Sequence, residues 1–199
     1  MTAWMRTAAW LFLGMALAAC APRMAAETAD AGDARLAEDV LIMPDGARLP
    51  LHVWESRGNP GPKAVILGVH GFNDYGMGFD LPAQWFAAQH IRVYAYDQRG
   101  FGAAPHPGVW SSDNRMARDL GHAVRLIQDR HPDTPVYVLG VSMGGAVTSA
   151  AAEHGHLPDV AGVILSAPSV WARATMPFYQ RWALWLGAHT VPWMTLTGA

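Results

Sequence analysis

Cysteine occurs once in the 199 residues, at Cys20, so the chain cannot form an intramolecular disulfide. Charged residues are also scarce, at 15% of the chain, and the formal net charge is −2. Without a basic excess, the sequence lacks the electrostatic footprint of a protein that binds nucleic acid. It also lacks a P-loop and the cysteine and histidine spacing of metal sites, so we expect no cofactor and no metal ion.

The apolar run at residues 7–19 is shorter than the roughly 20 residues that a transmembrane helix needs. Arg6 precedes this run and small residues end it, as in a secretory signal peptide. Leu17-Ala18-Ala19-Cys20 resembles a bacterial lipobox, which implies cleavage after residue 19 and a lipid anchor on Cys20. The resemblance places the protein in the cell envelope, and Ala21 after the cysteine favours the outer membrane. An ordinary signal peptide that carries a cysteine near its cleavage site is the alternative.

The remaining length predicts one domain with enough apolar content to bury a core. Residues 20–37 are rich in alanine, which predicts a flexible tether between anchor and domain. We expect the folded core at residues 38–170. Residues 171–199 form a separate aromatic segment, whose side chains could line an acyl-chain pocket, contact a membrane or simply pack on other residues.

The stretch Gly140-Val141-Ser142-Met143-Gly144 carries the clearest functional signal. An apolar, β-branched run precedes it and small residues follow, which predicts a strand, a tight turn and a helix. Glycines flank Ser142 because a Cβ at either position would collide with a neighbouring element. This arrangement is a nucleophile elbow: it holds the hydroxyl clear of the backbone and points helix N–H groups at the atom attacked.

The other predicted elements alternate between strands and helices. Asp45-Gly46 lies between two apolar runs and predicts a β-hairpin. Strands without alternation are expected at residues 64–69, 91–96 and 160–165, and helices at 79–90, 114–130 and 146–153. This order predicts an α/β fold with a doubly wound sheet, and functional residues at the carboxyl ends of its strands.

Two backbone N–H groups are candidates for an oxyanion hole, those of Met143 and Phe72. Gly71 lets the backbone turn so that the Phe72 N–H faces the pocket. His70 precedes the nucleophile in the chain and lies in this loop, so we expect it to support the loop through hydrogen bonds; a role as catalytic base is the alternative.

Together, several segments resemble the monoacylglycerol lipase and lysophospholipase group of α/β-hydrolases, which is also described as serine aminopeptidase-like. The matching segments are His70-Gly71-Phe72, residues 97–102, Leu139 to Gly145, and Ile164 to Pro168. The resemblance implies an α/β-hydrolase fold with a mostly parallel sheet. It also implies a cofactor-independent serine esterase, with Ser142 as nucleophile, that acts on glycerides, lysophospholipids or related esters.

The same resemblance assigns Asp97 and Arg99 to loop fixing, with the carboxylate accepting turn N–H groups and the arginine bracing it. It also implies a triad acid and histidine after the nucleophile, and the sequence supplies neither at a suitable place. The candidates are Glu153, Asp159 and the histidines at 154, 156 and 189. We therefore expect this chain to contain the fold only as far as its sixth strand and the start of a lid.

Two departures from the family pattern bear on substrate preference. The group often has histidine where this chain has Val141, and a small residue where it has Phe72. Without the triad partners, the chain is expected to be inactive or nearly so. The alternatives are a non-catalytic binding or scaffold lipoprotein, and acyl transfer to an acceptor other than water.

Overall fold

The computed structural model describes residues 24–58, 61–170 and 175–191. Met24–Val170 form one unit, and the helix α5 (Phe178–Thr190) belongs to a second. The expected signal peptide and Cys20 lie outside the described residues. Within them, no helix has both the length and the apolar character needed to cross a membrane.

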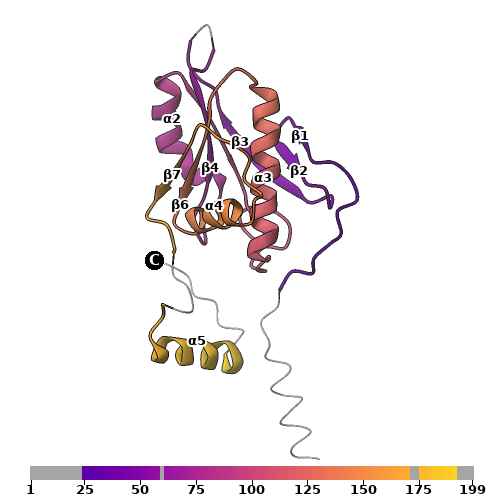
Figure 1. Cartoon of the computed structure of the whole chain (residues 1–199), viewed down its shortest axis with the longest axis vertical. Helices are drawn as coiled ribbons and strands as arrows, with labels where there is room; N and C mark the ends of the chain where they lie inside the picture. Colours follow the sequence, from indigo (N-terminus) through magenta and orange to yellow (C-terminus); the bar gives the residue numbers. More distant parts are fainter. Residues whose placement is uncertain (1–23, 59–60, 171–174, 192–199) are drawn as a thin grey trace, which may run out of the picture. The chain divides into compact units, whose positions relative to one another are not determined.

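The first unit is built on a seven-stranded sheet with the order β1-β2-β3-β5-β4-β6-β7 (Figure 1). The strands β5, β4, β6 and β7 run parallel, which confirms the predicted parallel core. On the other side, β3, β2 and β1 join with antiparallel pairing. Their bounds are β1 (Arg35–Ala37), β2 (Val40–Ile42), β3 (Arg48–Trp54), β4 (Ala64–Val69), β5 (Ile91–Tyr96), β6 (Val136–Val141) and β7 (Gly162–Ser166).

The hairpin predicted at Asp45-Gly46 is present between β2 and β3. Gly46 has φ 83, a left-handed conformation that favours glycine, and its N–H donates to the carbonyl of Met43 at 2.8 Å. The short strand β1, which pairs with β2, was not predicted.

Helices cover both faces of the sheet (Figure 1). The 3-10 turn η1 (Gly76–Phe79) and α2 (Asp80–Ala88) pack on one face, while α3 (Asp113–Arg130) and α4 (Met143–Glu153) pack on the other. Successive β4 residues enter opposite layers: Ile66 joins the α2 side and Leu67 the α3 side. This is why the strand lacks polar alternation.

Helix α3 buries the stripe that its three- and four-residue spacing predicts. Met116, Leu120, Val124 and Ile127 are each 2% exposed or less. The hydroxyl of Ser112 caps the helix by accepting the Arg115 N–H at 3.2 Å.

The edge strand β7 and the helix α5 are the most exposed apolar elements. Val163, Ile164 and Leu165 in β7 are each at least 43% exposed. Helix α5 forms within the segment expected to begin a lid, and its aromatic side chains pair along it, with Trp182 and Trp185 edge to face at 5.9 Å.

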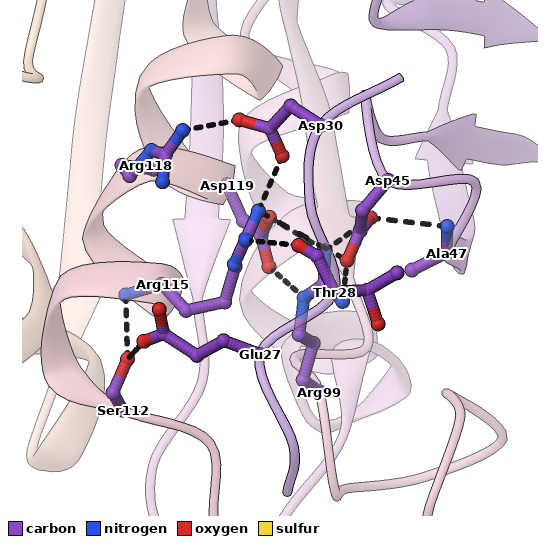
Figure 2. A network of polar contacts seen from close by, with 10 residues as sticks. All are labelled: Glu27, Thr28, Asp30, Asp45, Ala47, Arg99, Ser112, Arg115, Arg118 and Asp119. Carbon is purple, nitrogen blue, oxygen red and sulfur yellow. Dashed lines mark hydrogen bonds and ion pairs between the residues drawn. The ribbon is translucent and has the colours of Figure 1, made fainter. Parts of the chain in front are cut away.

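The expected flexible tether at residues 20–37 is not what the structure has from residue 24 onward. Residues 24–34, here called the strap, lie against the domain, and β1 continues the sheet (Figure 2). Composition suggested a free segment because it is rich in alanine. The few polar residues decide the outcome, since Glu27 and Asp30 bind partners on the loop before α3 and on α3 itself.

Candidate active site

Ser142 lies at the sharp turn between β6 and α4, the position predicted for a nucleophile. Strand β6 ends at Val141, helix α4 begins at Met143, and Ser142 between them has φ 50 and ψ −113. A non-glycine residue in this conformation costs on the order of 1–3 kcal/mol and persists only where the surroundings impose it. Such a strained strand-to-helix turn is the geometry of a nucleophile elbow.

The glycines around Ser142 are required by close packing. A Cβ on Gly144 would lie 2.0 Å from the carbonyl oxygen of Val69, at the end of β4. A Cβ on Gly140 would lie 2.7 Å from the Gly144 carbonyl oxygen, and one on Gly145 would lie 2.7 Å from Pro168. The start of α4 can therefore approach β4 and the segment after β7 only without side chains at these positions.

The loop after β4 lies directly against Ser142. A Cβ on Gly71 would lie 3.4 Å from the Ser142 Cβ and 4.0 Å from its Oγ. Because β4 and β6 are parallel neighbours, their carboxyl ends bring the 70–72 loop and Ser142 together. Met143 is the first residue of α4, so its N–H has no helical carbonyl to bind. Gly71, next to Phe72 in the chain, and Met143 therefore lie beside Ser142 on adjacent elements.

Hydrogen bonds at both ring nitrogens fix the tautomer of His70. Its Nε2 accepts the backbone N–H of Gln98 at 3.0 Å, so the proton sits on Nδ1, which donates to the Gly71 carbonyl at 2.8 Å. The Gln98 side chain returns a bond to the His70 carbonyl at 2.8 Å. Burial lowers the pKa of His70, which favours this neutral form. With both nitrogens engaged, His70 ties two loops together and has no nitrogen free to act as a base.

Asp97 fixes the loop after β5, as its expected role requires. Its carboxylate accepts the N–H of Gly76 and that of Ala103, each at 2.8 Å, and it contacts His52 Nε2 at 3.1 Å.

Arg99 does not brace Asp97. It binds Asp45 in the hairpin with two bonds, at 2.7 and 2.8 Å, and Asp119 on α3. Both carboxylates raise the pKa of Arg99 against the effect of burial, so the guanidinium stays charged. The arginine thus joins the β5 loop to two distant elements.

Ser169 is a residue of the site that the sequence did not reveal. Its Oγ lies 3.1 Å from the Ser142 Oγ, and its N–H donates to the Ser142 carbonyl at 2.9 Å. The Ser142 N–H in turn donates to the Ser166 carbonyl at 3.0 Å. Ala167, with φ 44, turns the chain between them. The only available signal was the position of the Ser166-to-Ser169 segment just after a strand that neighbours β6.

The histidines that follow Ser142 do not reach it within Met24–Val170. His154 ends α4 and His156 binds Asn114 at 2.8 Å, at the opposite end of that helix from the nucleophile. In the described residues, no hydrogen bond joins Ser142 to a histidine, and no group of three or more histidine, cysteine or acidic side chains could hold a metal ion.

Comparisons with known proteins agree with this geometry. Residues 60–199 match the family model described as serine aminopeptidase, S33. The monoglyceride lipase of Rattus norvegicus is 33% identical over 133 residues, which cover 66% of this chain and 43% of the relative. The monoacylglycerol lipase of Mycolicibacterium smegmatis is 30% identical over 126 residues, covering 63% and 44%. The chain thus spans less than half the length of these relatives.

A solved structure shares the fold. A soluble variant of monoglyceride lipase from Saccharomyces cerevisiae, in complex with a substrate analog, has a TM-score of 0.60 at 21% identity. That match covers 85% of this chain and 56% of the yeast structure. The parallel sheet, the strained turn at Ser142 and the family match agree: the chain belongs to the serine aminopeptidase S33 family and has the α/β-hydrolase fold.

Proposed function

We propose that this chain supplies the nucleophile and the oxyanion-hole donors of a serine ester hydrolase. The observation that carries the proposal is Ser142, held at φ 50 between β6 and α4 with Gly71 packed against its side chain. Ser142 Oγ would attack the ester carbonyl and form an acyl-enzyme, and the N–H groups of Phe72 and Met143 would bind the developing oxyanion. Donors of this kind are worth about 3–4 kcal/mol each in the transition state.

The proposed substrates are monoacylglycerols or lysophospholipid-type esters. Support comes from the curated relatives, whose names are monoglyceride lipase and monoacylglycerol lipase. Attack also requires a base to take the proton of Ser142, and the described residues pair its hydroxyl with Ser169 instead. We therefore propose that the described contacts alone give little turnover, because loss of triad partners lowers rates by several orders of magnitude.

We further propose that a lipid on Cys20 attaches the protein to the cell envelope, on the outer membrane or the periplasmic side. Support comes from the lipobox-like residues 17–20 alone.

Covalent labelling with a fluorophosphonate tests the nucleophile. We expect labelling at Ser142, identified by peptide mass spectrometry, to be fast in any longer natural product that contains this chain and much slower in this chain alone, because phosphonylation needs the same removal of the Ser142 proton. The Ser142→Ala variant should not label in either case. Ser149→Ala is a matched control, because that hydroxyl binds the Gly145 carbonyl within α4. Labelling that survives in Ser142→Ala would contradict the assignment.

A non-catalytic binding or scaffold role is the second candidate. The observation in its favour is the Ser142–Ser169 hydroxyl pair, which leaves the nucleophile bonded to a group that cannot act as a base. Hydrolysis of p-nitrophenyl butyrate separates the two. Turnover that depends on Ser142 supports the enzyme, whereas ester binding without any turnover, in this chain and in any longer natural product that contains it, supports the scaffold.

A further inference from the structure

The strap, residues 24–34, is bound to the domain at both ends. At its start, Met24 bridges to Trp110, and the Ala25 N–H donates to the Trp110 carbonyl at 2.9 Å. Near its end, the N–H groups of Ala31 and Gly32 donate to the carbonyl of Pro44, at 2.9 and 3.1 Å. The strap therefore spans from the loop before α3 to the β2–β3 hairpin.

Between these ends, the strap neutralises a buried arginine (Figure 2). Arg115 is 6% exposed, and its guanidinium donates to Asp30 Oδ1 and to the Thr28 carbonyl, each at 2.7 Å. Asp30 also pairs with Arg118. The bond from Arg115 lowers the pKa of Asp30, so its carboxylate is ionised at neutral pH. Asp45 in the hairpin lies 3.9 Å from the same guanidinium, but the hydrogen bonds of the Arg115 side chain go to the strap. Because a buried guanidinium without hydrogen-bond partners is costly, Arg115 favours the docked strap.

The residue bound by the start of the strap belongs to an aromatic cluster, Phe72, Phe101 and Trp110. The Trp110 ring lies 6.5 Å from Phe72 and 6.3 Å from Phe101, and Phe101 meets Phe72 edge to face at 5.5 Å. Phe101 also packs on His70 at 5.6 Å. Such distances and angles are those of favourable aromatic pairs. The strap and the proposed oxyanion donor are thus connected through Trp110.

We propose that the strap is a positioning element for the 70–72 loop. Docking through Asp30 and Arg115 holds Trp110, and Trp110 together with Phe101 holds the Phe72 side chain and thereby its backbone N–H. The catalytic consequence rests on the proposed ester hydrolase function, whereas the mechanical coupling does not. Phe72 is 65% exposed, so little of its side chain is enclosed by the domain. Among the described residues its ring pairs with Phe101 and Trp110, and the structure therefore assigns the positioning role to these contacts.

Hydrogen exchange followed by mass spectrometry tests the coupling without any need for activity. Asp30→Asn removes the charge that binds Arg115 and Arg118. We expect peptides that cover residues 24–34 and 70–77 to exchange at least about threefold faster, while α2 peptides at 80–88 keep the parent rate. Asp33→Asn is the matched control, since it makes the same change at a nearby exposed strap residue that forms no ion pair within the described residues, and it should behave as the parent.

Several outcomes would overturn the proposal. Asp30→Asn could free the strap and leave residues 70–77 unchanged, or it could leave the strap itself unchanged. Unprotected strap amides in the parent would also overturn it.

Two further measurements distinguish the proposed coupling from a general folding defect. Raising NaCl to 1 M, where the Debye length is about 3 Å, should speed exchange of both segments in the parent more than in Asp30→Asn. Trp110→Leu keeps the ion pairs and should speed exchange at 70–77 with little change at residues 28–32. Equal salt effects in the two proteins, or normal 70–77 exchange in Trp110→Leu, would contradict the coupling.

Discussion

At the scale of single residues, the hydroxyl pair of Ser142 and Ser169 is the contact closest to the proposed chemistry. Either oxygen can donate, and the 3.1 Å separation fixes the direction of the nucleophile. Two backbone bonds, from Ser142 to Ser166 and from Ser169 to Ser142, hold the partner in place. Ser169 is therefore placed to position the nucleophile.

We expect Ser169→Ala to slow fluorophosphonate labelling of Ser142 about fivefold, because a hydrogen bond of this kind contributes about 1 kcal/mol. Ser169→Thr keeps the hydroxyl and should restore most of the rate. The bimolecular labelling rate constants of the three proteins provide the measurement. Equal rates for parent and Ser169→Ala, or no recovery in Ser169→Thr, would show that the hydroxyl does not position Ser142.

Residue-scale contacts were also the hardest to predict from the sequence. The elbow was predictable because the strand, the glycines of the turn and the start of the helix all lie within residues 136–146. The partners of Arg99 were not, because Asp45 and Asp119 lie 54 and 20 positions away and only the fold brings them together. The prediction that Arg99 braces Asp97 was wrong for this reason.

At the scale of elements, the approach of α4 to β4 decides whether the elbow can form. A Cβ on Gly144 would meet two backbone oxygens, that of Val69 at 2.0 Å and that of His70 at 2.7 Å. Backbone atoms in the centre of a parallel sheet cannot move aside as a flexible side chain can.

We therefore expect Gly144→Ala to lower the free energy of unfolding by about 1–3 kcal/mol or more, as overpacking does. Gly32→Ala is the control, because an added Cβ there meets nothing within 4 Å, and it should change stability by less than about 0.5 kcal/mol. Urea denaturation monitored by circular dichroism measures both. A Gly144→Ala variant as stable as Gly32→Ala would mean that the helix start can shift to accept a side chain.

Elements whose sequence signal is local were predicted well. Helix α3 has its buried stripe, and the β2–β3 hairpin has its turn, because both signals are local. Strand β1 and the strap were not predicted because their residues show no hydrophobic periodicity. The placement of the strap depends on Arg115 and Trp110, which lie 85 and 86 positions later in the chain than their strap partners Asp30 and Met24.

At the scale of the whole molecule, docking of the strap changes the reach of the proposed lipid anchor. A free tether over residues 20–37 could extend about 58 Å, at roughly 3.4 Å per residue. With the strap bound from Met24, only the four steps from Cys20 remain, or about 14 Å. Met24 bridges to Trp110, and Trp110 packs on Phe72, so the first residue of the strap is linked to the loop beside Ser142 through Trp110.

The anchor itself is tested by Cys20→Ala in bacterial cells. We expect the parent to incorporate radiolabelled palmitate and to enter the detergent phase of Triton X-114, because acyl chains bury apolar surface at about 0.8 kcal/mol per CH₂. Cys20→Ala should lose the label and move to the aqueous phase, while Ala21→Ser, which leaves the cysteine in place, should remain acylated. Since Cys20 is the only cysteine, no other thiol can take up the lipid. A parent that carries no palmitate would show that the lipobox-like sequence acts as an ordinary signal peptide. A Cys20→Ala variant that still carries palmitate would show that the label is attached elsewhere.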